Sequence, residues 1–385
     1  MKLFRARIQA VETDRKKAME TPSAWNGLRK FRVDRKEHPS ENICSFYLIP
    51  HDRKPLPAFL PGQYLTFQLD SIPGQVKPTL RCYSLSDCYR PDYYRISVKR
   101  VCAPADQPDL PPGIGSSFLH DQIEIGSLLD VMAPNGNFSI NPEDSSALVL
   151  IGGGIGITPV LSMFNAIIET GSQREVWFFY GVRNPSENIL KEMLKELNHS
   201  IADRPNLHFQ VCYSEPVDNP DALLPYERHK THVSIKLLSS LLPSNNYEFY
   251  SCGPPPMMKA IKEDLRAWNV PARSIHEEVF PCRAENRQTH NNNEHPEVSV
   301  DFRKSGKQIM FSGECQSLLD LARDNDIGIA SACEVGSCGT CVSAIVAGNV
   351  EYFQEPSWKD ESQLIDEGLC LPCVCLPNSE IIIDQ

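Results

Sequence analysis

The cysteines near the end of the chain restrict its fold more than any other feature. The sequence of 385 residues contains 14 cysteines, and six of them lie between positions 333 and 375. Cys333, Cys338 and Cys341 have the spacing C-x4-C-x2-C. Three thiolates at this spacing, completed by a fourth cysteine from a distant segment, are the ligand pattern of an iron–sulfur cluster. We therefore expect the C-terminal part of the chain to fold around such a cluster.

The glycines between these cysteines support the cluster interpretation. A loop around an anionic cluster must bring backbone N–H groups close to sulfur, and Gly336 and Gly339 permit that approach. The alternative is a zinc ribbon built from the last two of these cysteines together with Cys370 and Cys373. Its central gap of 28 residues exceeds the usual gap of about 15–20. It also gives no role to Cys333 or to either glycine.

Composition and charge exclude several classes of protein. Hydrophobic residues make up 41% of the chain and charged residues 23%, as in ordinary globular proteins. No apolar run reaches the length of about 18 residues that a membrane-spanning helix needs, and residues 1–21 lack the apolar core of a signal peptide. We therefore expect a cytoplasmic protein whose grouped cysteines bind metal instead of forming disulfides. The net charge of −11 argues against nucleic acid as a partner.

The hydrophobic pattern divides the chain into five parts. Residues 1–22 are a polar extension. Short β-type runs bounded by Pro and Gly predict an antiparallel barrel or sandwich over residues 23–142. Apolar strands alternating with helical stretches predict a parallel α/β sheet over residues 143–280. Residues 281–296 contain no large aliphatic or aromatic side chain and are expected to be a linker, and residues 297–385 form a third unit.

Two motifs have the chemistry to hold nucleotide cofactors. Within residues 23–142, Arg81 offers a charged fork for a phosphate, and Tyr83 offers a ring that can stack on a planar heterocycle. Ser84 offers a hydroxyl that can bond the edge of that heterocycle. Within residues 143–280, the glycines of residues 152–159 lie between an apolar strand and a helix, where backbone can approach a pyrophosphate. This segment is not the dinucleotide fingerprint G-x-G-x-x-G, so a standard Rossmann site is not indicated.

Taken together, the motifs resemble those of the ferredoxin–NADP reductase superfamily. The chain contains R-x-Y-S-L from Arg81, Gly-x-x-Ser from Gly113 to Ser116, and G-G-x-G-x-T-P over residues 153–159. C-G-P-x-x-M at residues 252–257 and Glu-x-Phe at residues 278–280 follow in the family's order. The resemblance covers residues 23–280 and implies a flavin-binding barrel followed by a nicotinamide-binding domain.

The resemblance also implies site residues. The implied flavin-binding residues are Tyr64, Arg81, Tyr83, Ser84, Ser97, Val98, Gly115, Ser116 and Phe280. The implied NADH-binding residues are Gly153, Gly154, Gly156, Thr158, Cys252, Gly253 and Pro254. The residues implied to take part in hydride transfer are Ser84, Cys252, Glu278 and Phe280.

The C-terminal unit resembles plant-type two-iron two-sulfur ferredoxins, which implies an α+β fold of the β-grasp type. In that family the last ligand lies shortly before a proline and a final strand, and residues 371–377 match this frame with Cys373 as the ligand. The resemblance therefore implies a [2Fe-2S] cluster held by Cys333, Cys338, Cys341 and Cys373. Cys370 and Cys375 remain alternatives for the fourth ligand.

The choice of nucleotide and flavin can also be argued. NADPH-using members of the superfamily commonly place Ser and Arg after the third strand of the nicotinamide domain, where this chain has Glu215. A carboxylate there would repel a 2′-phosphate and could bond a ribose hydroxyl, which favours NADH. Arg183 keeps NADPH open as an alternative. The Gly-x-x-Ser segment and a barrel that resembles that of flavohaemoglobins favour FAD, with FMN as the alternative.

The order of the three units resembles the reductase components of Rieske-type oxygenase systems, of the phthalate dioxygenase and vanillate demethylase class. The resemblance implies hydride transfer from NADH to the flavin, then single electrons through the cluster to a protein acceptor, a Rieske oxygenase. A reductase for a haem monooxygenase or another metalloenzyme is the first alternative. A redox-sensing flavin and iron–sulfur protein without a dedicated acceptor is the second.

The distribution of charge points to the surface that would meet the acceptor. Residues 297–385 hold 15 Asp and Glu against 5 Lys and Arg, a balance of −10, whereas residues 1–296 hold 34 against 33, a balance of −1. Nearly all of the net charge therefore belongs to the ferredoxin unit. We expect its acidic face to dock on a basic surface of the acceptor.

Overall fold

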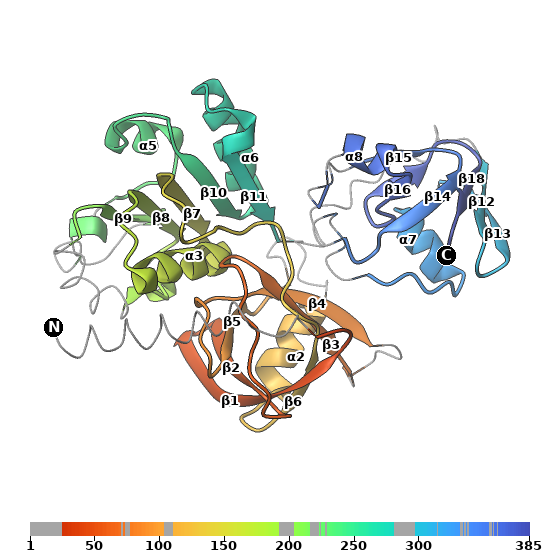
Figure 1. Ribbon diagram of the computed structural model, residues 1–385, viewed down its shortest axis with the longest axis horizontal. Helices are drawn as coiled ribbons and strands as arrows, with labels where there is room; N and C mark the ends of the chain where they lie inside the picture. The colour runs from red at the N-terminus through yellow and green to blue at the C-terminus, as the bar shows by residue number, and fades with distance from the viewer. Residues whose placement is uncertain are drawn as a thin grey trace. The chain divides into compact units, whose positions relative to one another are not determined.

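The structure, a computed structural model, consists of two compact units (Figure 1). It describes residues 25–70, 72–73, 78–103, 111–191, 204–215, 223, 225–227, 229–280, 297–313, 315–331, 334, 336, 339–353, 356, 358–359 and 361–385. Unit 1 comprises the described residues of Met1–Thr79 and Tyr83–Val279, and unit 2 those of Leu80–Cys82 and Phe280–Gln385. The predicted extension at 1–22 and linker at 281–296 lie outside the described residues. No helix among the described residues is long and apolar enough to cross a membrane.

Unit 1 begins with a six-stranded antiparallel sheet in the order β4-β3-β6-β1-β2-β5. Its elements are β1 (Arg29–Ser40), β2 (Ile43–Pro50), β3 (Tyr64–Leu69), β4 (Thr79–Ser84), β5 (Tyr94–Lys99), α2 (Ile114–Gln122) and β6 (Leu128–Val131). Leu85, which follows β4, pairs with Ile96 of β5. This bridge joins the two edge strands, so the sheet closes into a barrel and leaves no exposed edge there.

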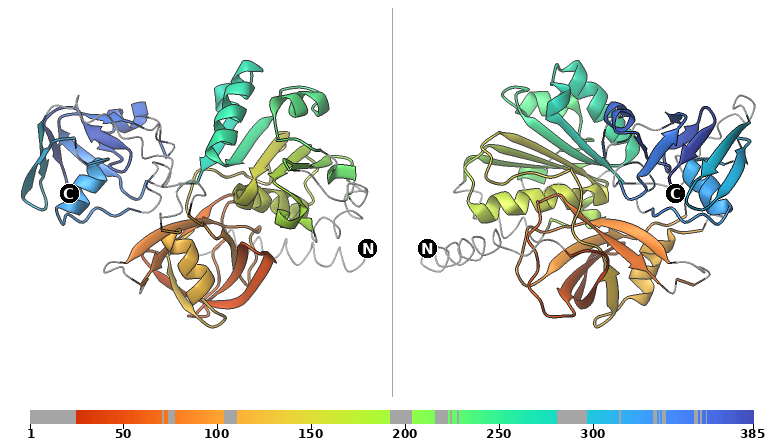
Figure 2. Two further views of the ribbon diagram at one scale, coloured as in Figure 1. Left: turned by 180° about the vertical axis from the view of Figure 1, so that it is seen from behind. Right: turned by 45° about the vertical axis from the view of Figure 1, so that its right-hand side comes forward.

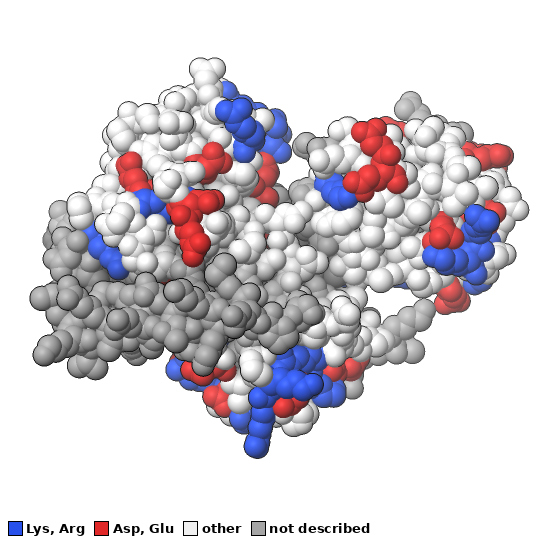
Figure 3. Space-filling model, in the orientation of Figure 1, with Lys and Arg blue, Asp and Glu red and all other residues white. Residues whose placement is uncertain are grey.

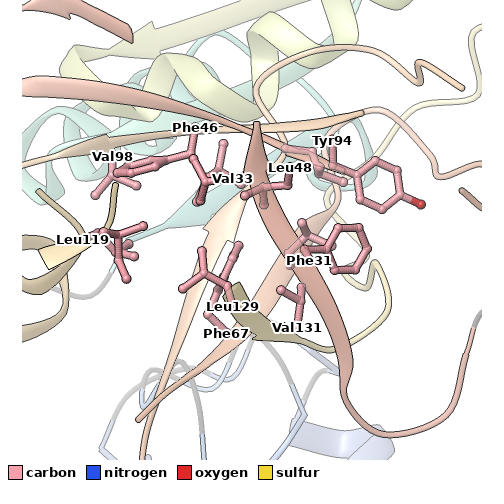
Figure 4. Close-up of a cluster of buried hydrophobic side chains, with 14 of the residues drawn as sticks. Phe31, Val33, Phe46, Leu48, Phe67, Tyr94, Val98, Leu119, Leu129 and Val131 are labelled. Atoms are coloured by element: carbon pink, nitrogen blue, oxygen red, sulfur yellow. The ribbon is translucent and has the colours of Figure 1, made fainter. Parts of the chain in front are cut away.

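Apolar side chains from every second strand position fill the barrel. They point toward one another in Figure 4, and those labelled are Phe31, Val33, Phe46, Leu48, Phe67, Tyr94, Val98, Leu119, Leu129 and Val131. Each is buried, and burying a side chain of this size stabilises the fold by about 1.5–3 kcal/mol. Leu119 comes from α2, so the helix packs its inner face against the same core.

The rest of unit 1 is a parallel sheet in the order β11-β10-β7-β8-β9. Its strands are β7 (Leu148–Gly153), β8 (Val176–Val182), β9 (Leu207–Tyr213), β10 (Glu248–Gly253) and β11 (Ile275–Val279). Phe178 and Phe209 pack against Phe164 of α3 (Ile157–Thr170) on one face. The other face packs against α5 (Ile235–Leu241) and α6 (Pro255–Ala267), as Figure 2 shows. Helices on both faces explain why β7 is apolar throughout.

Unit 2 is a mixed α+β fold. One sheet has the order β13-β12-β18-β14-β16, with β12 and β18 parallel, and β15 pairs with β17 in a second small sheet. The elements are β12 (Val298–Phe302), β13 (Lys307–Phe311), α7 (Leu318–Asp324), β14 (Ser343–Ala347), β15 (Val350–Tyr352), α8 (Glu361–Asp366), β16 (Leu369–Cys370), β17 (Cys375–Pro377) and β18 (Ile381–Ile383). The expected fold class of antiparallel barrel, parallel α/β sheet and α+β unit is confirmed.

Candidate functional site

The parallel sheet of unit 1 has its switch in strand order at β7. The chain runs from β7 to β8 and β9 on one side, then returns to β10 and β11 on the other. The carboxyl ends of β7 and β10 are therefore neighbours from which the following segments diverge, the place where open α/β sheets bind ligands. The two glycine-containing motifs, at residues 152–159 and 252–257, lie at these two strand ends.

The two motifs pack against each other through their glycines. A Cβ on Gly156 would lie 2.5 Å from the carbonyl oxygen of Cys252 and 2.6 Å from the nitrogen of Gly253. A Cβ on Gly153 would lie 2.7 Å from the sulfur of Met257. Because atoms cannot approach so closely, glycine at these positions allows the loops after β7 and β10 to share one narrow edge. The predicted NADH residues are thus brought together.

The start of α3 offers backbone donors. Gly154 begins the 3-10 turn η1 (Gly154–Gly156) with a φ of 52°, which favours glycine, and a Cβ there would meet nothing within 4 Å. The N-terminal residues of α3 have no side-chain cap, and Thr158 is buried with its hydroxyl donating to the Ile155 carbonyl at 3.1 Å. An open glycine beside uncapped N–H groups suits a pyrophosphate. Pro254 similarly precedes α6 as its N-cap.

Three of the residues predicted for hydride transfer lie together. Cys252 of β10 pairs in register with Glu278 of β11, and Ser84, at the end of barrel strand β4, donates a hydrogen bond from Oγ to Glu278 Oε2 at 3.3 Å. Cys252 is fully buried, and this burial, with a smaller contribution from Glu278, raises the pKa of the thiol well above its ordinary value. The barrel therefore contributes a hydroxyl to this cluster of residues, and the parallel sheet contributes a carboxylate and a neutral thiol. Phe280 follows β11 directly and is partly buried.

Three of the residues predicted to bind flavin, Tyr64, Tyr83 and Arg81, differ in their burial and in their contacts. Tyr64 is buried, and its ring lies where a Cβ on Gly136 would approach it to 2.8 Å. Tyr83 is partly buried and stands edge-on to Phe67, with ring centroids 5.6 Å apart. Arg81 lies on β4 and donates from Nη1 to the Leu80 carbonyl at 2.7 Å.

Ser97 and Val98 use their side chains within the protein. The Ser97 hydroxyl is hydrogen-bonded to the Ser45 and Ser86 hydroxyls at 2.8 and 2.9 Å. Val98 points into the barrel core, and its carbonyl lies 2.9 Å from His120 Nε2. The Ser97 hydroxyl is therefore engaged by two neighbouring hydroxyls, and the Val98 side chain belongs to the barrel core.

The first turn of α2 adds a residue that sequence reasoning missed. The predicted phosphate residue Ser116 accepts a hydrogen bond from the Val101 N–H at 3.1 Å and donates to the Gly113 carbonyl at 3.0 Å. The next hydroxyl, Ser117 Oγ, is buried and has no hydrogen-bond partner among the described residues. A buried hydroxyl without a partner is costly, and a phosphate oxygen beside Gly115 at this helix start would satisfy it. The segment thus fits a flavin phosphate.

Glu215 lies two residues after the edge strand β9, beside the loop that follows β8. Its N–H donates to the Arg183 carbonyl at 2.9 Å, and its carboxylate accepts from Asn184 Nδ2 at 2.9 Å. Arg183 itself forms an ion pair with Glu187 of the turn η2 (Pro185–Glu187). The carboxylate is therefore held in place, and the arginine that could attract an extra phosphate already has an acidic partner.

Two cysteine pairs occur among the described residues of unit 2. The sulfur atoms of Cys341 and Cys373 are 3.3 Å apart and both side chains are buried. Cys370 and Cys375 are fully buried in the core that α7 and β18 share, and burial together with a hydrogen bond between these two thiols raises the pKa of Cys375. Of the three candidates for the fourth ligand, Cys373 is thus the one whose sulfur lies next to that of Cys341. The predicted ligands Cys333 and Cys338 lie outside the described residues.

The cluster loop is covered by the segment before α8. Gly336 and Gly339 both have positive φ, 72° and 69°. A Cβ on Gly339 would lie 2.3 Å from the indole of Trp358, and one on Gly336 would lie 3.0 Å from Val374. The backbone N–H of Trp358 also donates to the Gly336 carbonyl at 2.9 Å. These contacts pack the two glycines closely against Trp358 and Val374, where a larger residue would not fit.

Comparison with known proteins agrees with this geometry. Residues 150–263 match the oxidoreductase NAD-binding domain family, and residues 302–378 match the 2Fe-2S iron-sulfur cluster binding domain family. The flavohemoprotein of Halalkalibacterium halodurans is 38% identical over 273 residues, which cover 71% of this chain and 64% of the relative. The chain thus spans less than two thirds of that relative's length.

Solved structures extend the likeness to both units. The flavohem-like FAD/NAD binding domain of nitric oxide dioxygenase from Vibrio cholerae O1 biovar El Tor is 28% identical, with a TM-score of 0.57, and the match covers 66% of this chain and 99% of that one. Phthalate dioxygenase reductase is 22% identical with a TM-score of 0.58, covering 94% and 98%. An intact type IV self-sufficient cytochrome P450 monooxygenase is 20% identical with a TM-score of 0.67, covering 95% and 43%.

At identities this low, the last two structures show the fold alone, but they show it for nearly the whole chain. The NAD-binding match and the 2Fe-2S match occur in one chain, and the fold of phthalate dioxygenase reductase covers 94% of that chain. The chain therefore joins a flavohemoprotein-like part, which contains an oxidoreductase NAD-binding domain, to a C-terminal 2Fe-2S iron-sulfur cluster binding domain.

Proposed function

We propose that this protein is an NADH-dependent reductase that binds FAD in the barrel and a [2Fe-2S] cluster in unit 2, and that it delivers electrons to a protein acceptor. The observation that carries the proposal is the hydrogen bond from Ser84 of the barrel to Glu278, beside Cys252 of the nicotinamide-binding sheet. When bound, the flavin accepts a hydride and releases electrons singly, and the cluster passes them on.

The chain's own groups orient the reactants. The glycines after β7 and β10 admit the nucleotide close to backbone, and the start of α3 supplies N–H donors for its pyrophosphate. The buried Cys252 thiol stays neutral, so it places no negative charge beside a nicotinamide ring. Glu278, which accepts the hydrogen bond from the Ser84 hydroxyl, fixes the direction of that hydroxyl at the barrel edge.

An anaerobic titration tests the reductase proposal. Adding NADH to the purified holoprotein should bleach both the flavin and the cluster absorbance within seconds. A flavin that is reduced while the cluster stays oxidised would contradict the electron-transfer pathway and favour a redox sensor. Failure of NADH to reduce the flavin would overturn the proposal as a whole.

FAD is proposed over FMN. Support comes from the likeness to the FAD/NAD binding domain of the Vibrio cholerae enzyme. The buried Ser117 hydroxyl at the start of α2 fits the phosphate that both flavins carry. Heat release of the flavin followed by chromatography tests this point. Recovery of FMN alone would refute it.

NADH is proposed over NADPH because Asn184 holds the Glu215 carboxylate while Arg183 is paired with Glu187. A 2′-phosphate near Glu215 would meet negative charge. Steady-state kinetics with both nucleotides should give kcat/KM at least about tenfold higher for NADH, equivalent to about 1.4 kcal/mol. Equal values would contradict this assignment.

For the acceptor we propose a Rieske non-haem iron oxygenase. The fold of phthalate dioxygenase reductase along nearly the whole chain supports it. A haem monooxygenase is the second candidate, because the fold of the self-sufficient P450 monooxygenase matches equally far along this chain. Reconstitution with purified oxygenases of both kinds decides between them: the true acceptor should be reduced at a rate that saturates with its concentration.

A further inference from the structure

Helix α3 has three polar side chains on the face that meets the barrel. Ser162, Asn165 and Glu169 follow at intervals of three and four residues, so they lie on one face of the helix. Ser162 Oγ donates to the Asp87 carbonyl at 2.6 Å, and Asn165 Nδ2 donates to Asp87 Oδ1 at 2.9 Å. Glu169 Oε2 lies 2.9 Å from Arg90 Nη1. All three side chains therefore reach the barrel loop that follows β4.

On the barrel side, Asp87 is held independently of the helix. It is 6% exposed, its Oδ1 accepts from the Cys88 N–H at 2.9 Å, and its Oδ2 accepts from the Tyr93 hydroxyl at 3.0 Å. Arg95 and Arg90 lie 3.8 and 3.9 Å from Oδ2. Burial, together with the Asp87 carboxylate, raises the pKa of Tyr93, so its phenol remains a donor. The carboxylate thus has a fixed position that the helix must match.

These contacts lie between the two halves of the proposed reaction site. Asp87 is three residues beyond Ser84, the barrel residue that bonds Glu278. Ser162 and Asn165 belong to the helix that starts directly after the glycine turn η1. A shift of α3 against the barrel would therefore move the nucleotide loop relative to the flavin-binding strand.

We infer that Ser162 and Asn165 are positioning residues that, through Asp87, set the distance between the flavin and the nicotinamide. This inference rests on the proposed function. Apolar contacts alone would let the helix slide on the barrel, because the hydrophobic effect has no direction. Hydrogen bonds weaken steeply when misaligned, so the bonds to the Asp87 main-chain carbonyl and carboxylate define one register. Hydride transfer needs such a register, since a displacement of about 1 Å can cost about a hundredfold in rate.

A pair of substitutions tests this inference. Asn165→Asp removes the amide donor and faces the Asp87 carboxylate with a second one, whereas Asn165→Leu removes the donor and adds no charge. Gln173→Glu, on the exposed turn after α3, changes the net charge equally and serves as the control. The measurements on the holoprotein are the rate of flavin reduction by NADH, the Kd for NADH and the primary isotope effect with deuterated NADH.

We expect Asn165→Asp to slow flavin reduction by about tenfold or more, with a raised isotope effect and less than a threefold change in Kd. Asn165→Leu should slow it by less, with a raised isotope effect as well, and Gln173→Glu should match the wild type. If Asn165→Asp fails to fold, Ser162→Ala removes one hydrogen bond and should raise the isotope effect by itself. An Asn165→Asp protein with the wild-type rate, or an Asn165→Leu protein with the wild-type rate and isotope effect, overturns the inference. Wild-type flavin that NADH does not reduce counts against the proposed function instead.

Discussion

Replacing Gly156 by alanine tests whether the close approach of the two glycine-containing loops matters. Gly156 has a φ of −62°, which any residue can adopt, so the backbone itself is not strained by alanine. The added Cβ, however, would lie 2.5 Å from the Cys252 carbonyl oxygen. Ordinary van der Waals contact begins at 3.4 Å, so the Cys252–Gly253 peptide and the loop must separate by about 0.9 Å.

That displacement has two costs. Forcing an extra methyl group into a packed site costs about 1–3 kcal/mol, and in this case the opposing atoms are backbone and have no other rotamer. The same shift moves Cys252 away from the turn that precedes α3, which should slow hydride transfer by about ten- to a hundredfold. The free energy of unfolding and the rate of flavin reduction should therefore both decrease.

Gly181→Ala is the matched control in the same sheet. Its Cβ would lie 3.2 Å from a methyl group of Val233, a side chain that can give by a few tenths of an ångström. Thermal unfolding and stopped-flow flavin reduction should show a large loss for Gly156→Ala and a small one for Gly181→Ala. Equal behaviour of the two variants, or a normal rate in a Gly156→Ala protein, would refute the packing argument.

Three further predictions concern the cysteines and the cluster loop. Cys373→Ser should lose the visible absorbance of the cluster, whereas Cys370→Ser should keep it; the reverse result would move the fourth ligand to Cys370. Trp358→Ala should leave the cluster loop uncovered and so shorten the half-life of the cluster absorbance in air. Trp358→Phe should keep most of the wild-type half-life. Burial raises the pKa of the Cys252 thiol well above its ordinary value, so flavin reduction should show no thiol inflection from about pH 7 to 9, and an inflection that Cys252→Ala removes would contradict this.

Local sequence pattern was sufficient for the fold class. The change from short strands between Pro and Gly to apolar strands alternating with helices predicts the antiparallel barrel and the parallel sheet, because each pattern follows from which faces are buried. The grouping of Ser84, Cys252 and Glu278 came from motifs that resemble a family. Their roles remain predictions, but their proximity is observed.

The interactions that sequence could not supply are those between distant segments. Ser162 and Asn165 look like ordinary helix residues until Asp87, 75 and 78 positions earlier, is placed against them. Ser117 follows the serine that the motif selected, and only its burial without a partner distinguishes it. Gly339 was expected to admit backbone to sulfur, but the structure adds the indole of Trp358 as a second reason for glycine.

The uneven distribution of charge leads to a last prediction about the acceptor. Within unit 2, Lys359, Arg323 and Lys304 already pair with acidic side chains of the same unit, and Figure 3 shows acidic patches on this face of the unit. The remaining acidic surplus is therefore available to an approaching basic surface. Such attraction is screened within about 8 Å at physiological salt.

Raising the salt concentration should consequently slow bimolecular reduction of the acceptor by the reduced protein, with an effect of about tenfold or more. Electron transfer from flavin to cluster within one chain should change far less, because residues 1–296 have a balance of only −1 and offer little net charge to hold the acidic unit. Stopped-flow measurements of both steps over the same salt series separate the two effects. Equal salt dependence of both steps would mean that the acidic surplus acts within the chain, and an acceptor step that salt leaves unchanged would remove electrostatic docking from the mechanism.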